Sequence, residues 1–189
     1  MKVIIGTDIG TSGVKVLAVD ENCRVVGSNV TEYPIYTPNP GWTEQNPDDW
    51  WNAAAAGLKK LIPQLSGYEI AGVGLSGQMH GMVALDAENR VVRPAILWND
   101  QRTEKQCKEI ISAAGGLDSL ISMTNNGMLT GFTAGKILWM KENEPENYKK
   151  TVRIVNPKDY IAYKLTGNVV TDVSDASGTG LFDVVNGRF

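Results

Sequence analysis

VIIGTDIGTSGVKVLAV, at residues 3–19, is the part of the chain with the clearest local pattern. Two short apolar runs rich in β-branched residues, Val3–Asp8 and Val14–Val19, flank a glycine-rich turn at residues 9–13. Such runs around a tight turn are typical of strands paired in a hairpin. A third apolar run at residues 25–26 follows another short turn, so we predict an antiparallel meander of three strands.

The first turn carries groups suited to a phosphate. Gly10 lets backbone N–H groups approach an anion, and the hydroxyls of Thr11 and Ser12 add donors. Asp8 ends the first strand, where its carboxylate can hold Mg²⁺ directly or through water. We include Lys15 as a candidate phosphate ligand, although alone it is typical of a solvated strand residue. A plain hairpin with a polar turn explains the same residues, so both interpretations stay open.

Helix and strand signals alternate along the rest of the chain. A helix is predicted from Pro47, because Asn46 can cap it and Asp48 favours the positive end of its dipole. Another is expected between a Thr103–Gln106 capping box and Gly115. The other expected elements are strands at 70–76 and 82–85 and helices at 133–142 and 157–167. No linker divides the chain, which reads as one α/β or α+β unit.

The composition is that of an ordinary globular protein. Of the 189 residues, 42% are hydrophobic and 21% are charged, which excludes a disordered or collagen-like chain. A net charge of −3 weighs against nucleic-acid binding, which usually needs a basic excess. Cys23 and Cys107 are too few for a disulfide framework, and no apolar run could span a bilayer. The sequence therefore predicts a cytoplasmic protein without nucleic-acid or membrane partners.

A polar loop, SGQMHG at residues 76–81, follows a predicted strand, where α/β sheets place ligands. Gln78 and His80, the only histidine, form a compact set suited to recognition of hydroxyl groups. A zinc site lacks its ligand spacing, and a hydrolase built on Ser76 lacks the GxSxG elbow. The GxGxxG match at 72–77 lies within a strand, so we do not take it as a dinucleotide site.

A second polar cluster, WNDQR at residues 98–102, follows an apolar run. It is either a loop with helix-start residues or a wall of hydrogen-bonding groups with an aromatic plate, as carbohydrate sites use. We take Trp98, Asp100 and Arg102 as candidate substrate-binding residues. The other four of the five tryptophans are assigned to the core or its support.

A series of short motifs runs in order along nearly the whole chain. They are DIGTS at 8–12, GWTEQ at 41–45, DWW at 49–51, GQMHG at 77–81, WNDQR at 98–102, GFT at 131–133, PKDY at 157–160 and DVSDASGT at 172–179. Together they resemble the FGGY family of carbohydrate kinases. The resemblance implies an α/β domain of the actin-like, ribonuclease-H-like kind, with a mixed sheet and flanking helices. In that family a second domain faces the first and holds the adenosine of ATP.

The resemblance also implies roles for individual residues. Asp8 would position Mg²⁺ and the transferring phosphoryl group of ATP, with Thr11 and Ser12 near the phosphates. Met79 and His80 would contact the sugar, with the cluster at 98–102 lining or supporting the same pocket. Glycerol kinases have an Arg-Glu pair in place of Met79 and His80. The substrate implied is therefore a linear ketose, D-xylulose first, with a heptulose or another pentulose as the nearest rival.

The chain departs from the family pattern in one respect. The family's catalytic base is an aspartate in a downstream Gly-Gly-Asp-Asn-like segment, which is absent here. Asp172, Asp175 and Asp183 belong to a different motif and are not candidates for that base. We therefore expect residues 1–189 to be an incomplete N-terminal sugar-binding domain of a longer kinase. The C-terminal ATP-binding domain is absent, and this chain alone is expected to be inactive.

Three other interpretations stay open. The chain could be a naturally short, non-catalytic module for sugar binding or interaction, a kinase of another ketose such as a heptulose, or an actin-like ATPase unrelated to sugars. Strands and cleft surfaces left uncovered would favour association, so a homodimer is a further expectation.

Overall fold

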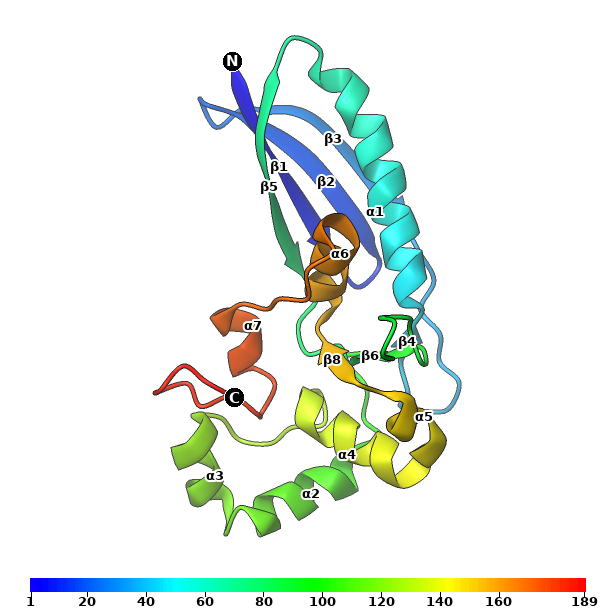
Figure 1. Ribbon diagram of the computed structural model, residues 1–189, viewed down its shortest axis with the longest axis vertical. Helices are drawn as coiled ribbons and strands as arrows, with labels where there is room; N and C mark the ends of the chain where they lie inside the picture. Colours follow the sequence, from blue (N-terminus) through cyan, green and yellow to red (C-terminus); the bar gives the residue numbers. More distant parts are fainter.

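A four-stranded mixed sheet forms one end of the molecule, shown in Figure 1. The computed structural model describes all residues, 1–189. Strands β1 (Lys2–Ile9), β2 (Gly13–Asp20) and β3 (Val25–Glu32) form the predicted antiparallel meander. Strand β5 (Glu69–Gly77) lies parallel to β1, giving the order β3-β2-β1-β5.

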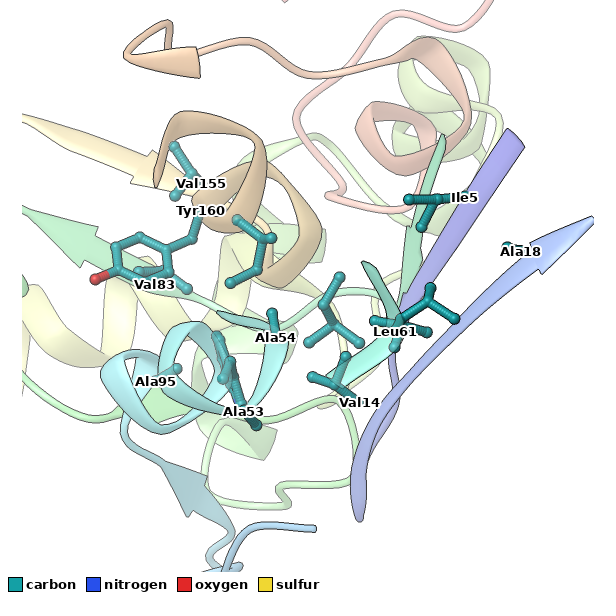
Figure 2. Close-up of a cluster of buried hydrophobic side chains, with 14 of the residues drawn as sticks. Ile5, Val14, Ala18, Ala53, Ala54, Leu61, Val83, Ala95, Val155 and Tyr160 are labelled. Carbon is teal, nitrogen blue, oxygen red and sulfur yellow. The ribbon is translucent and has the colours of Figure 1, made fainter. Parts of the chain in front are cut away.

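One face of the sheet forms the main core with helix α1 (Pro47–Leu61). Alternate strand residues such as Ile5 and Val14 face the helix, and Ala54 and Leu61 meet them from its apolar side, as Figure 2 shows. Asn46 caps the helix as predicted, because its side chain accepts a hydrogen bond from the Asp48 N–H at 3.1 Å. A short 3₁₀ turn, η1 (Ile62–Leu65), then follows.

The lower half of the molecule in Figure 1 is mainly helical. Its small sheets pair β4 (Glu44–Gln45) with β7 (Ala95–Ile96) and β6 (Val83–Leu85) with β8 (Arg153–Val155). Its helices are α2 (Glu104–Ala113), α3 (Leu117–Thr124), α4 (Thr133–Asn143), α5 (Pro145–Lys150), α6 (Pro157–Thr166) and α7 (Val173–Ser177). Helices α2, α4 and α6 confirm the three predicted here, whereas α3, α5 and α7 were not foreseen. None of the helices is long and apolar enough to cross a lipid bilayer.

The expected capping box of α2 is wrong. Thr103 makes no side-chain cap; its hydroxyl donates instead to the carbonyl of Thr130 at 3.1 Å. Gln106 reaches away from the helix start and donates to the Glu142 carboxylate at 2.8 Å. Both side chains therefore bond to residues elsewhere in the chain instead of to each other's backbone at the start of the helix.

The sheet face opposite α1 is uncovered. Ile4 and Val30 lie on it and are each 59% exposed, whereas the neighbouring Val3 and Ile5 point into the core. The carboxyl ends of β1 and β5 are at the end of the sheet that faces the helical half, close to α6 and α7 (Figure 1).

Candidate functional site

Two polar segments begin at the same edge of the large sheet. Strands β1 and β5 are parallel and end together, with Asp8 beside Ser76 and Ile9 beside Gly77. The turn at residues 10–12 and the loop at residues 78–81 therefore leave the sheet side by side. This places the predicted phosphate-binding turn next to the predicted sugar-binding loop.

The turn at residues 10–12 is tightly held by its own backbone. The N–H of Gly10 donates to the carbonyl of Gly13 at 3.0 Å, and the Tyr33 hydroxyl donates to the Gly10 carbonyl. Burial, with a smaller effect of the Asp8 carboxylate, raises the pKa of Tyr33, so its hydroxyl remains a donor. A Cβ atom at Gly13 would lie 2.7 Å from the carbonyl oxygen of Thr31, so this position requires glycine.

The candidate magnesium and phosphate ligands surround this turn. Asp8 and Ser12 are exposed, and Lys15 is an exposed residue of β2 paired with Asp8 in the sheet register. A Cβ atom at Gly10 would come within 3.9 Å of the Asp8 Oδ2 atom, so glycine keeps the approach to that carboxylate open. Carboxylate and hydroxyl oxygens beside open space fit the oxygen ligands that Mg²⁺ prefers.

Trp98 connects the turn to the second predicted cluster. Its indole N–H donates to the Thr11 hydroxyl oxygen at 3.1 Å, and the side chain is 42% exposed. The Thr11 hydroxyl keeps its own proton free to donate. Trp98 thus contacts the turn but does not line the cavity next to the sugar loop, and substrate binding by Trp98 stays a prediction.

A cavity of about 580 Å³ lies beyond the sugar loop. That volume falls within the range of small-molecule sites. Its lining includes the predicted Met79 and His80 and, in addition, Phe132, Lys158, Asp175 and Gly178. Met79 is 50% exposed, so its thioether is a free apolar surface in the cavity.

His80 is fixed in an unusual backbone conformation. Its φ of 59° lies in the left-handed region, where few residues other than glycine and asparagine are found. The imidazole packs against Phe132, with ring centroids 4.8 Å apart, and a Cβ atom at Gly178 would lie 2.2 Å from its Cε1 atom. Burial first, and the nearby Lys136 ammonium second, lower the pKa of His80. The neutral ring therefore offers one donor and one acceptor nitrogen.

Hydrogen bonds from Lys136 stabilise this backbone conformation of His80. Its side chain is fully buried, and its Nζ donates to the carbonyls of His80 and Gly131, both at 2.7 Å. Burial lowers the pKa of Lys136 to about 7, against the attraction of the Asp100 carboxylate. The sequence analysis missed Lys136, because a single lysine in a helix is usually exposed.

The structure contradicts direct substrate contact for Asp100 and Arg102. Both side chains are fully buried. The Arg102 guanidinium donates to both oxygens of Asp100, at 2.9 and 2.8 Å, and lies 2.8 Å from Glu44. It also lies over the Trp42 ring, 3.8 Å from the centroid. The pair supports the site instead, because Asp100 also accepts the Thr43 N–H at 2.7 Å.

Gln78 is also directed inward. It is only 6% exposed, and its amide nitrogen donates to Gln45 Oε1 at 2.8 Å. Direct sugar contact by this side chain is contradicted by its burial. Gln45, its partner, was not among the predicted site residues.

Lys158 is a second residue that the sequence analysis missed. Its Nζ lies 2.5, 2.6 and 3.1 Å from carboxylate oxygens of Asp159, Asp172 and Asp175. Although burial opposes it, these acids raise the pKa of Lys158, which therefore stays charged. The ammonium already occupies the centre of the three carboxylates, so they offer no open metal site. The motifs PKDY and DVSDASGT contained these residues, but no local signal showed that they meet.

The model of the N-terminal domain of the FGGY family of carbohydrate kinases matches residues 3–189. The chain belongs to this family. The expected fold is confirmed as well, because solved structures similar to this chain are sugar kinases of the actin-like, ribonuclease-H-like kind.

Among its relatives in the family are proteins named xylulose kinase. The one from Staphylococcus xylosus is 44% identical over 184 residues, which are 97% of this chain and 38% of that protein. The one from Lactococcus lactis is 45% identical over 97% of this chain and 37% of that protein. A crystal structure of a xyloylose kinase from Brucella ovis has a TM-score of 0.92 at 39% identity, covering 99% of this chain and 38% of its own. This chain thus spans less than two fifths of the length of these family members.

Proposed function

We propose that residues 1–189 form the sugar-binding part of a xylulose kinase, which converts D-xylulose and ATP into D-xylulose 5-phosphate and ADP. One observation carries the proposal. The exposed Asp8 and its glycine-rich turn lie beside the cavity of Met79 and His80, at the shared end of β1 and β5. The 44% identity to a protein named xylulose kinase favours a ketose over other sugars.

The cavity suits a small polyhydroxylated molecule. The Nδ1 atom of the neutral His80 imidazole is buried, so Nε2 is the ring nitrogen that would donate to, or accept from, a sugar hydroxyl group. Met79 provides an apolar surface for the carbon chain, and the charged Lys158 lies in the same lining. Such a mixture of apolar surface and a few placed polar groups is typical of small-molecule sites.

The phosphate side of the site is the turn after β1. Asp8 would hold Mg²⁺, and the hydroxyls of Thr11 and Ser12, with the Lys15 ammonium, would bind phosphate oxygens of ATP. Bound Mg²⁺ neutralises charge on the phosphates during transfer. These residues would hold the phosphoryl group at the mouth of the cavity, so that a sugar hydroxyl lies in line with it.

We place the catalytic base and the adenosine site outside residues 1–189. The acidic residues that line the cavity, Asp172 and Asp175, are both held by the Lys158 ammonium, and neither lies in a Gly-Gly-Asp-Asn-like segment such as carries the family's base. A general base is typically worth ~10²–10⁴ in rate. The chain alone would then bind the sugar without useful turnover.

The test is a substrate panel on the full-length protein that contains residues 1–189. ATP-dependent phosphorylation of D-xylulose, D-ribulose, sedoheptulose and glycerol is measured, and D-xylulose is expected to give the highest kcat/KM. A higher value for another substrate would overturn the proposed substrate. His80→Ala should lower kcat/KM for D-xylulose at least ~10-fold, because the variant loses a buried hydrogen bond between uncharged groups and the packing of the imidazole ring. Arg90→Ala, on an exposed turn that does not line the cavity, is the matched control.

The 189-residue chain provides a second arm. Calorimetry should detect D-xylulose binding to this chain, whereas a coupled assay should detect no turnover. Saturable turnover by residues 1–189 alone would show that the base lies within them and would overturn the proposed division of the site.

A further inference from the structure

Gln45, in the two-residue strand β4, is fully buried and uses every hydrogen-bonding position of its amide. Its Nε2 donates to the carbonyls of Thr11, at 2.8 Å, and Pro34, at 3.2 Å. Its Oε1 accepts from Trp50 Nε1, at 3.0 Å, and from Gln78 Nε2, at 2.8 Å. Two donors and two acceptor positions are thus all occupied, which is the full capacity of a glutamine side chain.

Two of these four bonds join the halves of the proposed active site. Thr11 belongs to the phosphate-binding turn, and Gln78 opens the sugar-binding loop that continues to His80. The other two bonds fix the amide itself, because Trp50 anchors it to helix α1 and Pro34 to the segment after β3. The amide therefore has one orientation and one position relative to both loops.

We propose that Gln45 is a positioning residue that sets the distance between the phosphate-binding turn and the sugar-binding loop. The inference rests on the proposed function. In-line phosphoryl transfer depends on the placement of the two reactants, and a displacement of about 1 Å can cost ~10²-fold in rate. Gln45 touches neither reactant; it acts through Thr11 and Gln78.

Other contacts keep the loops near each other when Gln45 is changed. The Gln78 N–H donates to the carbonyl of Ile9 at 2.7 Å, and Trp98 holds the Thr11 hydroxyl. Loss of the amide should therefore shift the two loops relative to each other without separating them. The consequence should appear in the chemical step more than in the affinity for either substrate.

Two substitutions remove the amide in different ways. Gln45→Met keeps the length of the side chain and removes all four bonds. Gln45→Glu keeps the acceptor for Trp50 and Gln78 but places an oxygen against the carbonyls of Thr11 and Pro34, which have no proton to share. The matched control is Tyr160→Phe, which removes one hydrogen bond of 2.7 Å to Asp48 in the same core and leaves Gln45 untouched.

The experiment measures kcat, KM for D-xylulose, KM for ATP and Tm in the full-length protein that contains residues 1–189. Both Gln45 variants should lower kcat by ~10–100-fold while either KM changes less than about threefold. Tyr160→Phe should lower Tm and leave kcat within about twofold. If one Gln45 variant does not fold, Gln78→Leu takes its place, since it cuts only the link to the sugar loop, and the same fall in kcat is expected.

The outcomes separate the inference from the proposed function. If the wild-type protein phosphorylates D-xylulose and the Gln45 variants lose stability with kcat unchanged, Gln45 is a structural residue and the inference is wrong. A rise in KM that accounts for the whole loss of kcat/KM would also overturn it, because the amide would then serve binding alone. If the wild-type protein phosphorylates no ketose, the proposed function fails, and the inference fails with it.

Discussion

Arg102 shows how a residue predicted to bind substrate can instead hold the site together. Its guanidinium lies over both the Trp42 and the Trp139 ring, 3.8 and 4.8 Å from their centroids, and is paired with Asp100 and Glu44. Arg102→Met would leave the buried Asp100 carboxylate without its cation, and Glu44 would keep only its ion pair with Arg93. We expect the free energy of unfolding to fall by about 3–5 kcal/mol, as for other broken buried pairs.

Urea unfolding followed by tryptophan fluorescence measures this change. Arg90→Met is the control, because Arg90 pairs with Asp86 and Glu88 on the surface, where such bonds contribute little. A loss in Arg102→Met no larger than that of the control would contradict the buried ion pair.

His80 makes the stability of this protein depend on pH. Its pKa is lowered in the folded state, mainly by burial, so the unfolded chain takes up the proton first as the pH falls. The contribution of His80 to stability should be complete above about pH 6.5, its ordinary pKa, and should decline below it. We expect His80→Asn to have a shallower loss of Tm between pH 7.5 and pH 5.5 than the wild type. Parallel Tm profiles for the two proteins would refute this assignment.

At the residue scale, the sequence indicated which polar segments meet at the ends of β1 and β5, but not which of their side chains are buried. Asp8 and His80 stand out locally, because one ends a strand before a glycine turn and the other lies in a polar loop. Asp100, Arg102 and Gln78 were misassigned, since polar residues near such a loop can face either way. Their direction is set by Glu44 and Gln45, which no spacing in the sequence connects to them.

At the scale of elements, two hairpin turns share the same pattern of hydrogen bonds. Asp20 accepts the N–H groups of Asn22 and Arg24, and Asp86 accepts those of Glu88 and Arg90 in the same way. Residues 17–26, LAVDENCRVV, resemble residues 83–92, VALDAENRVV, and this likeness reflects shared turn chemistry.

The two turns differ at their left-handed residue, and this allows a paired test. Cys23 and Asn89 both have φ of 59°, and asparagine adopts this conformation at a lower cost than other residues. Cys23→Asn should raise the free energy of unfolding, and Asn89→Cys should lower it, each by about 1 kcal/mol. The denaturant midpoints of the two variants, compared with that of the wild type, measure these changes in stability. Shifts in the same direction would contradict the backbone argument.

Helices were predictable where their caps are local and their length gives a clear pattern. Asn46 and Asn156 precede helices α1 and α6 and cap them through nearby residues. In α6, for example, the Asn156 N–H donates to the Asp159 carboxylate at 3.3 Å. Helix α2 also formed, but its Thr103 found a partner outside the helix. Helices α5 and α7 contain 6 and 5 residues, too few to show a helical period in sequence.

For the whole molecule, the bare face of the large sheet has a consequence in solution. Ile4 and Val30 are each 59% exposed there. Exposed apolar sheet surface favours association. We expect residues 1–189 to self-associate at micromolar concentration or above, and the double variant Ile4→Thr, Val30→Thr to sediment closer to the monomer. Sedimentation velocity measures both. Identical behaviour of the two would place any association elsewhere.

The parallel pairing of β1 with β5 also imposes an order on folding. Residues 1–32 contain everything that the antiparallel meander needs, so its contacts are local and form quickly. Strand β1 gains its other neighbour only after β5 has been synthesised and the intervening loop has closed, at an entropic cost. During synthesis, the hairpin that contains Asp8 should therefore form before Ser76 pairs beside it. The edge of β1 that later pairs with β5 is, until then, unpaired and within reach of other chains and of chaperones.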